Sequence, residues 1–404
     1  MKSIYFEANL PKIAALKVLG ALSKKFYYTR LSPVVYRDLP DQPLPGENWV
    51  KVRNVLTGIC GTDLSFFLLK PDFRAALAAM PGSERTYLGH EQVGVVEEVG
   101  SGVQNLKPGD RVTMQKYMAC CDLKEIDPPC TFCRQGLYCL CENYGEEGPR
   151  PLKNLGAGFG DYFLAPEKQL VKIPPDLGDD QAVMLEPAAV SLHAVLRRPP
   201  RDGEKILVFG GGAIGLNVIQ CLKMLNPSCR VYLLERVKSK QEFGLRLGAD
   251  EVLTGDPYEA VAAAVGGKLY RGPLGNKMIM GGFDVIFDCV GTAQTFHDSL
   301  RWLKARGTYV KIGHHIRPAA FDETPIWWQE LEIIGINAHG MEEFDGRRIS
   351  TFDLVIELAR QGRYKLEGFI THRFKLDQYK EAFRTMIERS EEVIKVVLEI
   401  QPPE

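Results

Sequence analysis

Residues 205–215 read KILVFGGGAIG, which is a short apolar run followed by a glycine-rich turn. Gly210, Gly212 and Gly215 satisfy the pattern G-x-G-x-x-G, and they come directly after a predicted strand and open a predicted helix. The first glycine permits a tight turn, the second lets the backbone approach a pyrophosphate, and the third lets helix and strand pack closely. The stretch therefore predicts a dinucleotide-binding turn, and a turn without a ligand is the alternative.

The helix start and the next strand end supply further candidate cofactor contacts. The N–H groups of Ala213 and Ile214 would face the phosphates. Glu235 stands twenty residues after the third glycine, where a carboxylate accepts hydrogen bonds from ribose hydroxyls and repels a 2′-phosphate. The carboxylate therefore favours NAD. Arg236 and Lys240 could neutralise a 2′-phosphate, so NADP is the alternative cofactor.

Strands and helices alternate through this part of the chain. Three more short apolar runs are predicted strands: residues 231–234, 283–289 and 308–312. Such alternation predicts a doubly wound parallel sheet over residues 190–323, which makes the fold class α/β. At the ends of the last two strands, Val290 and Ile312 are expected to contact the cofactor.

The rest of the chain has a different sequence pattern. Residues 46–115 consist of short β-rich runs separated by glycine and proline, which predicts a small barrel or sandwich. We assign the tail back to this part, because the nucleotide-binding sheet is expected to be complete by then. The predicted domains are therefore 1–189 with 324–404, and 190–323 between them. Three stretches look like insertions: residues 10–30, 68–86 and 266–282.

The composition excludes several classes of function. The 404 residues include 50 basic and 51 acidic ones, so the formal net charge of -1 gives no reason to expect nucleic acid or a membrane as partner. No apolar run approaches the roughly 20 residues that span a bilayer. The N-terminus lacks the pattern of a signal peptide, so a cytoplasmic location is expected.

Two groups of residues have the chemistry of metal ligands. Cys60-Gly61-Thr62-Asp63 follows one apolar strand, and Gly89-His90-Glu91 precedes another. Thiol, imidazole and carboxylate all bind zinc, and a catalytic zinc ion keeps one position open. Each residue alone would more often be structural. The second group is a cysteine cluster, which in a large intracellular chain indicates a metal site: Cys120, Cys121, Cys130, Cys133, Cys139 and Cys141.

Several motifs in order resemble the zinc-dependent medium-chain alcohol dehydrogenase family. The run Gly89-His90-Glu91-x-x-Gly94-x5-Gly100-x-x-Val103 resembles its zinc signature, and the Cys60 loop is similar to its first ligand loop. Residues 370–383 are similar to its C-terminal segment. The resemblance implies a GroES-like β-barrel catalytic domain beside the Rossmann sheet.

The resemblance also implies roles for single residues. Cys60 and His90 would bind a catalytic zinc ion, and Glu91 would be a ligand or a close neighbour of one. Glu186 would supply the remaining ligand, as in the polyol, sugar and threonine dehydrogenases of the family; a carboxylate that stabilises a helix start is the alternative. Thr62 would hydrogen-bond the substrate oxygen, or merely stabilise a turn. Ser65 stands where many relatives carry a proton-relaying histidine, so the relay beyond Thr62 is open.

Relatives of this family often hold a second, structural zinc ion. The spacing that resembles theirs is Asp127-x2-Cys130-x2-Cys133-x7-Cys141, with an aspartate as first ligand. Cys120, Cys121 or Cys139 could compete for the ion, and a lobe folded around reduced thiols without metal is the alternative.

The resemblance implies hydride transfer between a small alcohol, such as a polyol, sugar, cyclitol or amino alcohol, and NAD or NADP. The family also implies a homodimer or homotetramer. Two rivals remain: a zinc-free enone or quinone reductase that uses NADPH, and a catalytically silent nucleotide-binding protein. The set Cys60, His90, Glu91 and Glu186 argues against both, since neither needs these residues together.

Overall fold

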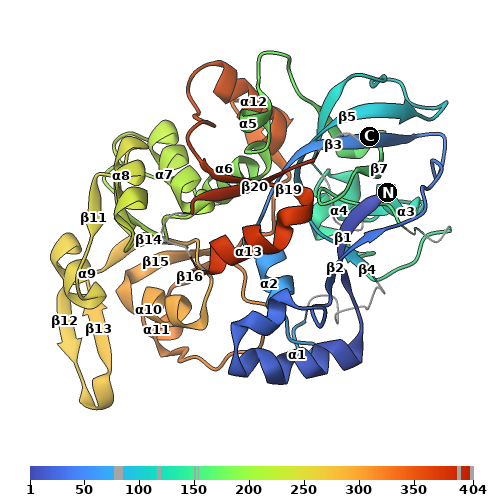
Figure 1. The fold of residues 1–404 in the computed structure, drawn as a ribbon. Helices are drawn as coiled ribbons and strands as arrows, with labels where there is room; N and C mark the ends of the chain where they lie inside the picture. Colours follow the sequence, from blue (N-terminus) through green and yellow to red (C-terminus); the bar gives the residue numbers. More distant parts are fainter. Residues whose placement is uncertain (77–84, 116–119, 150–151, 153, 389–392, 401–404) are drawn as a thin grey trace. The chain divides into compact units, whose positions relative to one another are not determined.

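The computed structural model describes residues 1–76, 85–115, 120–149, 152, 154–388 and 393–400. The chain forms two compact units (Figure 1). Unit 1 comprises Met1–Glu186 and Leu366–Glu404, and unit 2 comprises Pro187–Lys365. Within the described ranges, no helix is long and apolar enough to cross a membrane.

Unit 1 is built on a mostly antiparallel sheet of seven strands. The strand order is β19-β20-β3-β5-β6-β8, and β7 pairs with β3. Their bounds are β3 (Trp49–Gly58), β5 (Glu91–Val99), β6 (Arg111–Met114), β7 (Tyr162–Pro166), β8 (Leu170–Lys172), β19 (Ile370–Lys375) and β20 (Lys395–Glu399). Val50, Val52, Val96, Val112 and Phe163 project from these strands into one core. This is the expected barrel-like domain.

Smaller elements complete unit 1. A three-stranded sheet has the order β2-β1-β4. Its strands are β1 (Lys2–Glu7), β2 (Val34–Asp38) and β4 (Arg85–Tyr87). The helices are α1 (Leu10–Leu22), α2 (Gly61–Phe67), α3 (Cys121–Lys124), α4 (Thr131–Arg134), α5 (Asp179–Ala182) and α13 (Tyr379–Glu388).

Unit 2 contains a parallel sheet of six strands in the order β11-β10-β9-β14-β15-β16. The strands are β9 (Lys205–Phe209), β10 (Arg230–Leu234), β11 (Glu251–Leu253), β14 (Phe283–Asp288), β15 (Leu303–Lys311) and β16 (Glu332–Gly335). The helices are α6 (Leu185–Arg197), which starts in unit 1, α7 (Ala213–Leu225), α8 (Lys238–Arg246), α9 (Pro257–Val265), α10 (Ala293–Trp302), α11 (Thr324–Trp328) and α12 (Thr351–Arg360). The predicted doubly wound α/β sheet is confirmed.

The expected boundary after residue 323 is wrong. Strand β16 pairs in parallel with β15, so the sheet is not complete at residue 312. Unit 2 accordingly continues through α12 to Lys365, and only the chain from Leu366 onward returns to unit 1. A short strand with exposed side chains carries no signal in the sequence that tells which sheet it joins.

The insertions have different structures. Residues 10–30 form α1 and a 3-10 turn, Lys24–Tyr28. Residues 266–282 form an antiparallel hairpin of β12 (Lys268–Arg271) and β13 (Lys277–Met280). Of the insertion at 68–86, residues 77–84 lie outside the described part of the chain. A second hairpin, β17 (Met341–Phe344) with β18 (Arg347–Ser350), precedes α12.

Candidate active site

The register of β3 and β5 brings the two predicted ligand loops together. Gly58, the last residue of β3, pairs with Glu91, the first residue of β5. Cys60 therefore follows β3 beside His90, which directly precedes β5. One ligand atom from each of Cys60, His90 and Glu91 lies within 4.8 Å of the others. The structure thus groups a thiol, an imidazole and a carboxylate, which are ligands that zinc accepts.

Asp63 joins the two loops by hydrogen bonds. Its Oδ2 atom accepts from the backbone N–H of Cys60 at 2.9 Å, and its Oδ1 atom accepts from the N–H of Gly89 at 3.1 Å. The Nδ1 atom of His90 lies 3.9 Å from Oδ1. Burial raises the pKa of Asp63, although the imidazole and the two N–H groups oppose that rise. Sequence reasoning gave this residue no role; the signal was its position three residues after the helix N-cap.

A buried lysine holds the carboxylate of Glu91. The Nζ atom of Lys395 lies 2.6 Å from both Oε1 and Oε2, and both side chains are buried. Burial lowers the pKa of Lys395, but the neighbouring acidic groups, Glu91 first, together outweigh burial and raise it. At residue 58, a side chain would put its Cβ atom 2.0 Å from Oε2, so glycine is required there. Lys395 was missed because it lies 304 residues from its partner.

Glu186 belongs to the same buried group of charges. It lies in the first turn of α6 and is 4% exposed. Burial raises its pKa to about 7, with His90 and Lys395 opposing the rise and Glu91 adding to it. Its carboxylate is not among the three atoms grouped within 4.8 Å, but its charge contributes to the raised pKa of His90.

The hydroxyl of Thr62 lies two residues after Cys60 and is not engaged by the described residues. It is buried and has no hydrogen-bond partner within the part of the chain that the structure describes. A buried hydroxyl without a hydrogen-bond partner costs free energy, so its presence calls for an explanation such as a functional role. Ser65 differs, since its hydroxyl donates to the carbonyl of Gly61 at 2.9 Å within α2. Ser65 is therefore already engaged.

The site contains more acidic groups than basic ones, so a cation could bind there. Burial of His90 lowers its pKa, but the neighbouring acidic groups, Cys60 and Asp63 first, outweigh burial and raise it. Three buried carboxylates and a thiol face a single lysine and an imidazole: Asp63, Glu91, Glu186 and Cys60 against Lys395 and His90. Buried acidic groups keep their charge only where a cation compensates it, and a divalent ion would do so. The donor set fits zinc.

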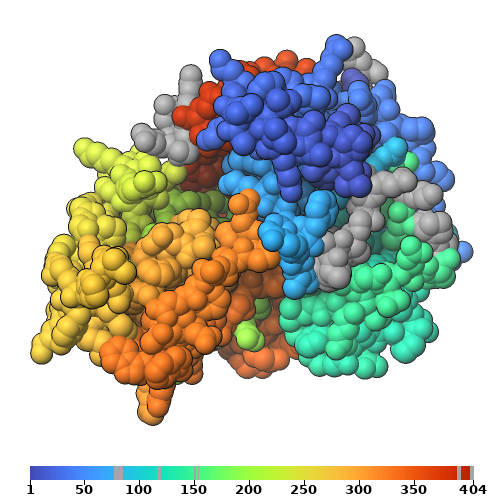
Figure 2. All heavy atoms as spheres, turned by 90° about the horizontal axis from the view of Figure 1, so that it is seen from below, coloured from blue at the N-terminus to red at the C-terminus, as the bar shows by residue number. Residues whose placement is uncertain are grey.

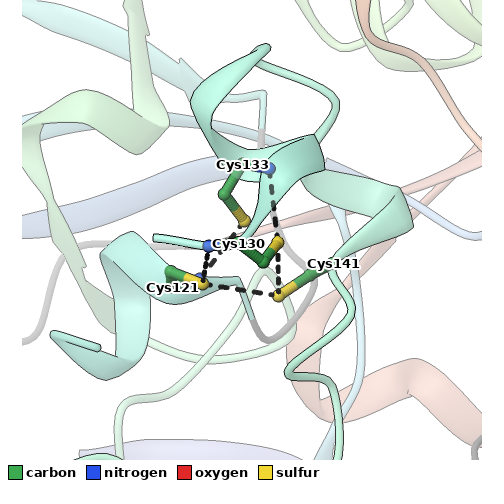
Figure 3. Close-up of side chains that lie close together, drawn as sticks. All are labelled: Cys121, Cys130, Cys133 and Cys141. Atoms are coloured by element: carbon green, nitrogen blue, oxygen red, sulfur yellow. Dashed lines mark hydrogen bonds between the residues drawn. The ribbon is translucent and has the colours of Figure 1, made fainter. Parts of the chain in front are cut away.

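A second candidate metal site consists of four cysteines (Figure 3). The ligand atoms of Cys121, Cys130, Cys133 and Cys141 all lie within 4.8 Å of one another. The sulfur atoms of Cys121 and Cys141 are 3.8 Å apart, and those of Cys130 and Cys141 are 4.0 Å apart. Four converging thiols match a closed structural zinc site.

The structure groups Cys121, rather than the predicted first ligand Asp127, with Cys130, Cys133 and Cys141. The one-turn helix α3 and the chain after it fold back, so that the backbone N–H of Cys130 donates to the sulfur of Cys121 at 3.3 Å. Burial opposes ionisation of Cys130, but hydrogen bonds from the N–H groups of Cys133 and Glu142 and from the thiols of Cys133 and Cys141 together lower its pKa to about 6. Spacing alone could not show this fold-back.

The glycine turn in unit 2 has the predicted form. Gly210 adopts a φ of 98°, which side chains rarely tolerate. A Cβ atom at Gly215 would lie 1.9 Å from the carbonyl oxygen of Gly210, so helix and strand require glycine to pack this closely. Gly212 is the N-cap of α7, and the N–H groups of Ala213 and Ile214 begin that helix.

Glu235 is fixed by the backbone around it. Its Oε2 atom accepts from the N–H of Gly211 at 2.8 Å. Its Oε1 atom accepts from the N–H groups of Arg236 and Val237 at 2.7 and 2.9 Å. The carboxylate is half-buried, whereas Arg236 is exposed. A carboxylate held in this way keeps lone pairs for ribose hydroxyls.

The two strand ends differ in exposure. Val290 is exposed and lies against the turn, since a Cβ atom at Gly210 would be 2.5 Å from its Cγ2. Ile312 is buried, and its N–H donates to the carbonyl of Asp288 at 3.1 Å. The carboxylate of Asp288, which sequence reasoning missed, organises this edge. It accepts from the N–H groups of Val290 and Gly291 and from the hydroxyls of Thr295 and Tyr309.

Comparisons with known proteins agree with both halves of this description. Residues 46–175 match the alcohol dehydrogenase GroES-like domain, and residues 213–352 match the zinc-binding dehydrogenase domain. D-arabinitol dehydrogenase 1 of Uromyces fabae is 28% identical over 86% of this chain and 90% of its own. (R,R)-butanediol dehydrogenase of Bacillus subtilis is 29% identical over 87% of this chain and 93% of its own.

The crystal structure of 2R,3R-butanediol dehydrogenase from Bacillus subtilis aligns with a TM-score of 0.70 at 25% identity, covering 100% of this chain and 99% of that one. The two domain matches occupy consecutive parts of the chain in the expected order, and the candidate ligand loops lie in the first. The chain belongs to the zinc-dependent medium-chain alcohol dehydrogenase family.

Proposed function

We propose that this protein is a zinc-dependent dehydrogenase that transfers hydride between a small polyol-like alcohol and NAD. The observation that carries the proposal is the convergence of Cys60, His90 and the carboxylate of Glu91, with the buried carboxylate of Glu186 close enough to help raise the pKa of His90. Units 1 and 2 would supply the catalytic residues and the nucleotide-binding residues, respectively. The family also supports a homodimer or homotetramer, which light scattering would test.

Cys60, His90 and Glu186 would hold the zinc ion. Glu91 would stay beside it, because Lys395 occupies both of its oxygens. When bound, zinc supplies a Lewis acid that lowers the pKa of an alcohol oxygen. Asp63 keeps the Cys60 and His90 loops at a fixed separation, so the ligands are preorganised.

The unpartnered hydroxyl of Thr62 would accept the proton of the substrate hydroxyl in a hydrogen bond. Since the hydroxyl of Ser65 is bonded within α2, the proton would leave Thr62 through water or a cofactor hydroxyl rather than through Ser65. When bound, the nicotinamide cofactor would supply the acceptor for the hydride of the substrate carbon.

NAD is the proposed cofactor. The carboxylate of Glu235 is anchored by three backbone N–H groups and would repel a 2′-phosphate. The neighbouring Arg236 is exposed and free to turn toward a phosphate, so NADP use would be weaker rather than absent.

The proposed substrates carry adjacent hydroxyls. Glu186 supports this class, and D-arabinitol and butanediol, which the names of two relatives give, are of this kind. The test is a screen of polyols, sugars, cyclitols, amino alcohols and simple alcohols with NAD and NADP, followed by absorbance of the reduced cofactor. Turnover of diols that is lost on chelation and restored by zinc supports the proposal. Reduction of enones or quinones that survives chelation would identify a zinc-free reductase, and cofactor binding without turnover a silent protein.

A further inference from the structure

Helix α1 (Leu10–Leu22) carries apolar side chains on its outer side as well as on its buried side. Ile13 and Leu16 pack with Leu69 in a small core. On the outer side, Leu10 is 65% exposed, Val18 67% and Leu22 78%. With the exposed Ala14, these residues recur at four-residue intervals and form one stripe along the helix. A contiguous exposed apolar stripe of this kind is typical of an interaction surface.

The segment of sequence that carries this stripe is strongly basic. Between Glu7 and Asp38 the sequence contains no acidic residue and six basic ones: Lys12, Lys17, Lys24, Lys25, Arg30 and Arg37. Lys12 pairs with Glu7 at 3.1 Å, while the other five are exposed. The whole chain has a formal net charge of -1, so this excess is local. Figure 2 shows the N-terminal segment, in dark blue, at the surface of the molecule.

The helix is already formed and capped. The side chain of Asn9 accepts a hydrogen bond from the N–H of Lys12 at 3.1 Å, and Pro11 occupies the first turn. The exposed ring of Phe73 lies next to the helix, with the Nζ atom of Lys17 5.7 Å from the ring centre. A partner would therefore meet a rigid surface and pay little ordering entropy.

We propose that α1 and the basic residues after it dock on an anionic lipid surface. Leu10, Val18 and Leu22 would enter the boundary of the acyl chains while Lys17, Lys24 and Lys25 reach the phosphates. A second copy of this chain fits the face less well, because two such faces would bring like charges together. This inference does not depend on the proposed catalytic function.

Flotation of the full-length protein with vesicles tests the proposal. The expected result is binding to vesicles of equal parts phosphatidylglycerol and phosphatidylcholine, little binding to pure phosphatidylcholine, and loss of binding at high salt. Two variants change exposed side chains only: V18Q/L22Q removes apolar contacts, and K24E/K25E reverses charge. Each should lower partitioning roughly ten-fold or more.

Matched controls change the same chemistry elsewhere. L274Q alters an exposed leucine at the tip of the β12–β13 hairpin, and K268E/R363E makes the same change in net charge at exposed positions of unit 2. Both controls should bind vesicles like the unaltered protein. Absence of binding by the unaltered protein, or equal loss with control and α1 variants, overturns the proposal.

Two other outcomes would indicate that the outer side of α1 binds another partner. A smaller particle mass for V18Q/L22Q in light scattering would make the face a contact between copies. Saturable binding to polyglutamate without binding to vesicles would make it a surface for an acidic protein. Either result overturns the proposal for lipid.

Discussion

The Nζ atom of Lys395, on the final strand β20, lies 2.6 Å from both carboxylate oxygens of Glu91, on β5. Both side chains are buried, so Lys395 neutralises the carboxylate of Glu91 without a contribution from zinc. It also explains how Glu91 can lie beside Cys60 and His90 without being a zinc ligand in our proposal.

Replacing Lys395 by methionine should leave Glu91 as a buried charge without its cation. Loss of one partner of a buried pair costs about 3–5 kcal/mol, so the free energy of unfolding should fall by that order. Denaturant unfolding monitored by fluorescence measures it. K395R should recover most of the loss, and E91Q/K395M part of it. A K395M protein as stable as the unaltered one would show that the pair is unimportant.

Zinc content of variants should separate the two sites. The unaltered protein should carry two zinc ions per chain, while C60A and C121A should each carry one, because each removes a ligand from a different group. D127A should keep two, since Asp127 is outside the four-cysteine group. Metal analysis after gel filtration measures the content. One ion in D127A together with two in C121A would restore the aspartate as ligand.

Zinc affinity of the metal-free protein should rise with pH through the region around 7. Burial raises the pKa of Glu186 to about 7, and the pKa of His90 is also raised, so below these values protons occupy groups that zinc needs. For each proton that must dissociate before zinc binds, the zinc affinity changes by at most about ten-fold per pH unit. Competition with a chromogenic chelator from pH 6 to 8 measures the slope. E186Q should reduce the slope of zinc affinity against pH by the equivalent of one proton. An unchanged slope would contradict the role of Glu186.

The hydroxyl of Thr62 should matter for turnover rather than for folding. T62V removes a buried hydroxyl that has no partner among the described residues, so stability should not fall. The same change should lower kcat by about 10²–10⁴-fold, the range for lost acid–base assistance, while T62S should retain most activity. Steady-state kinetics with the best alcohol of the screen measures both. Equal kcat in T62V and the unaltered protein would make Thr62 a turn residue.

E235A should relax the preference for NAD over NADP, because it removes the carboxylate that repels a 2′-phosphate. E235Q is the matched variant, since it keeps a hydrogen-bonding group but loses the charge. The ratio of kcat/KM for the two cofactors measures the preference. An unchanged ratio in both variants would show that the carboxylate only shapes the turn.

Features carried by local pattern could be predicted from the sequence. The glycine turn at residues 210–215 and the strands around it follow from apolar runs and backbone sterics. The loops of Cys60 and His90 each adjoin a strand that the sequence indicates, and their motifs are local.

Features that depend on distant partners could not be predicted. Lys395 meets Glu91 across 304 residues, and no periodicity reports that contact. Cys121 replaces Asp127 because α3 folds back, whereas ligand spacing assumes a simple loop. Strand β16 joins the parallel sheet through its pairing with β15, which its four residues do not reveal.

The lobe around residues 120–141 has its own cysteines as its core. Cys120, Cys121, Cys133 and Cys141 are the buried residues of that cluster, and Leu123, Ile126 and Tyr138 pack against them. Oxidation of two of Cys121, Cys133 and Cys141 to a disulfide would thus remove two candidate ligands and distort the packing at the same time. The lobe would be a point at which oxidative stress and metal starvation inactivate the protein by the same route.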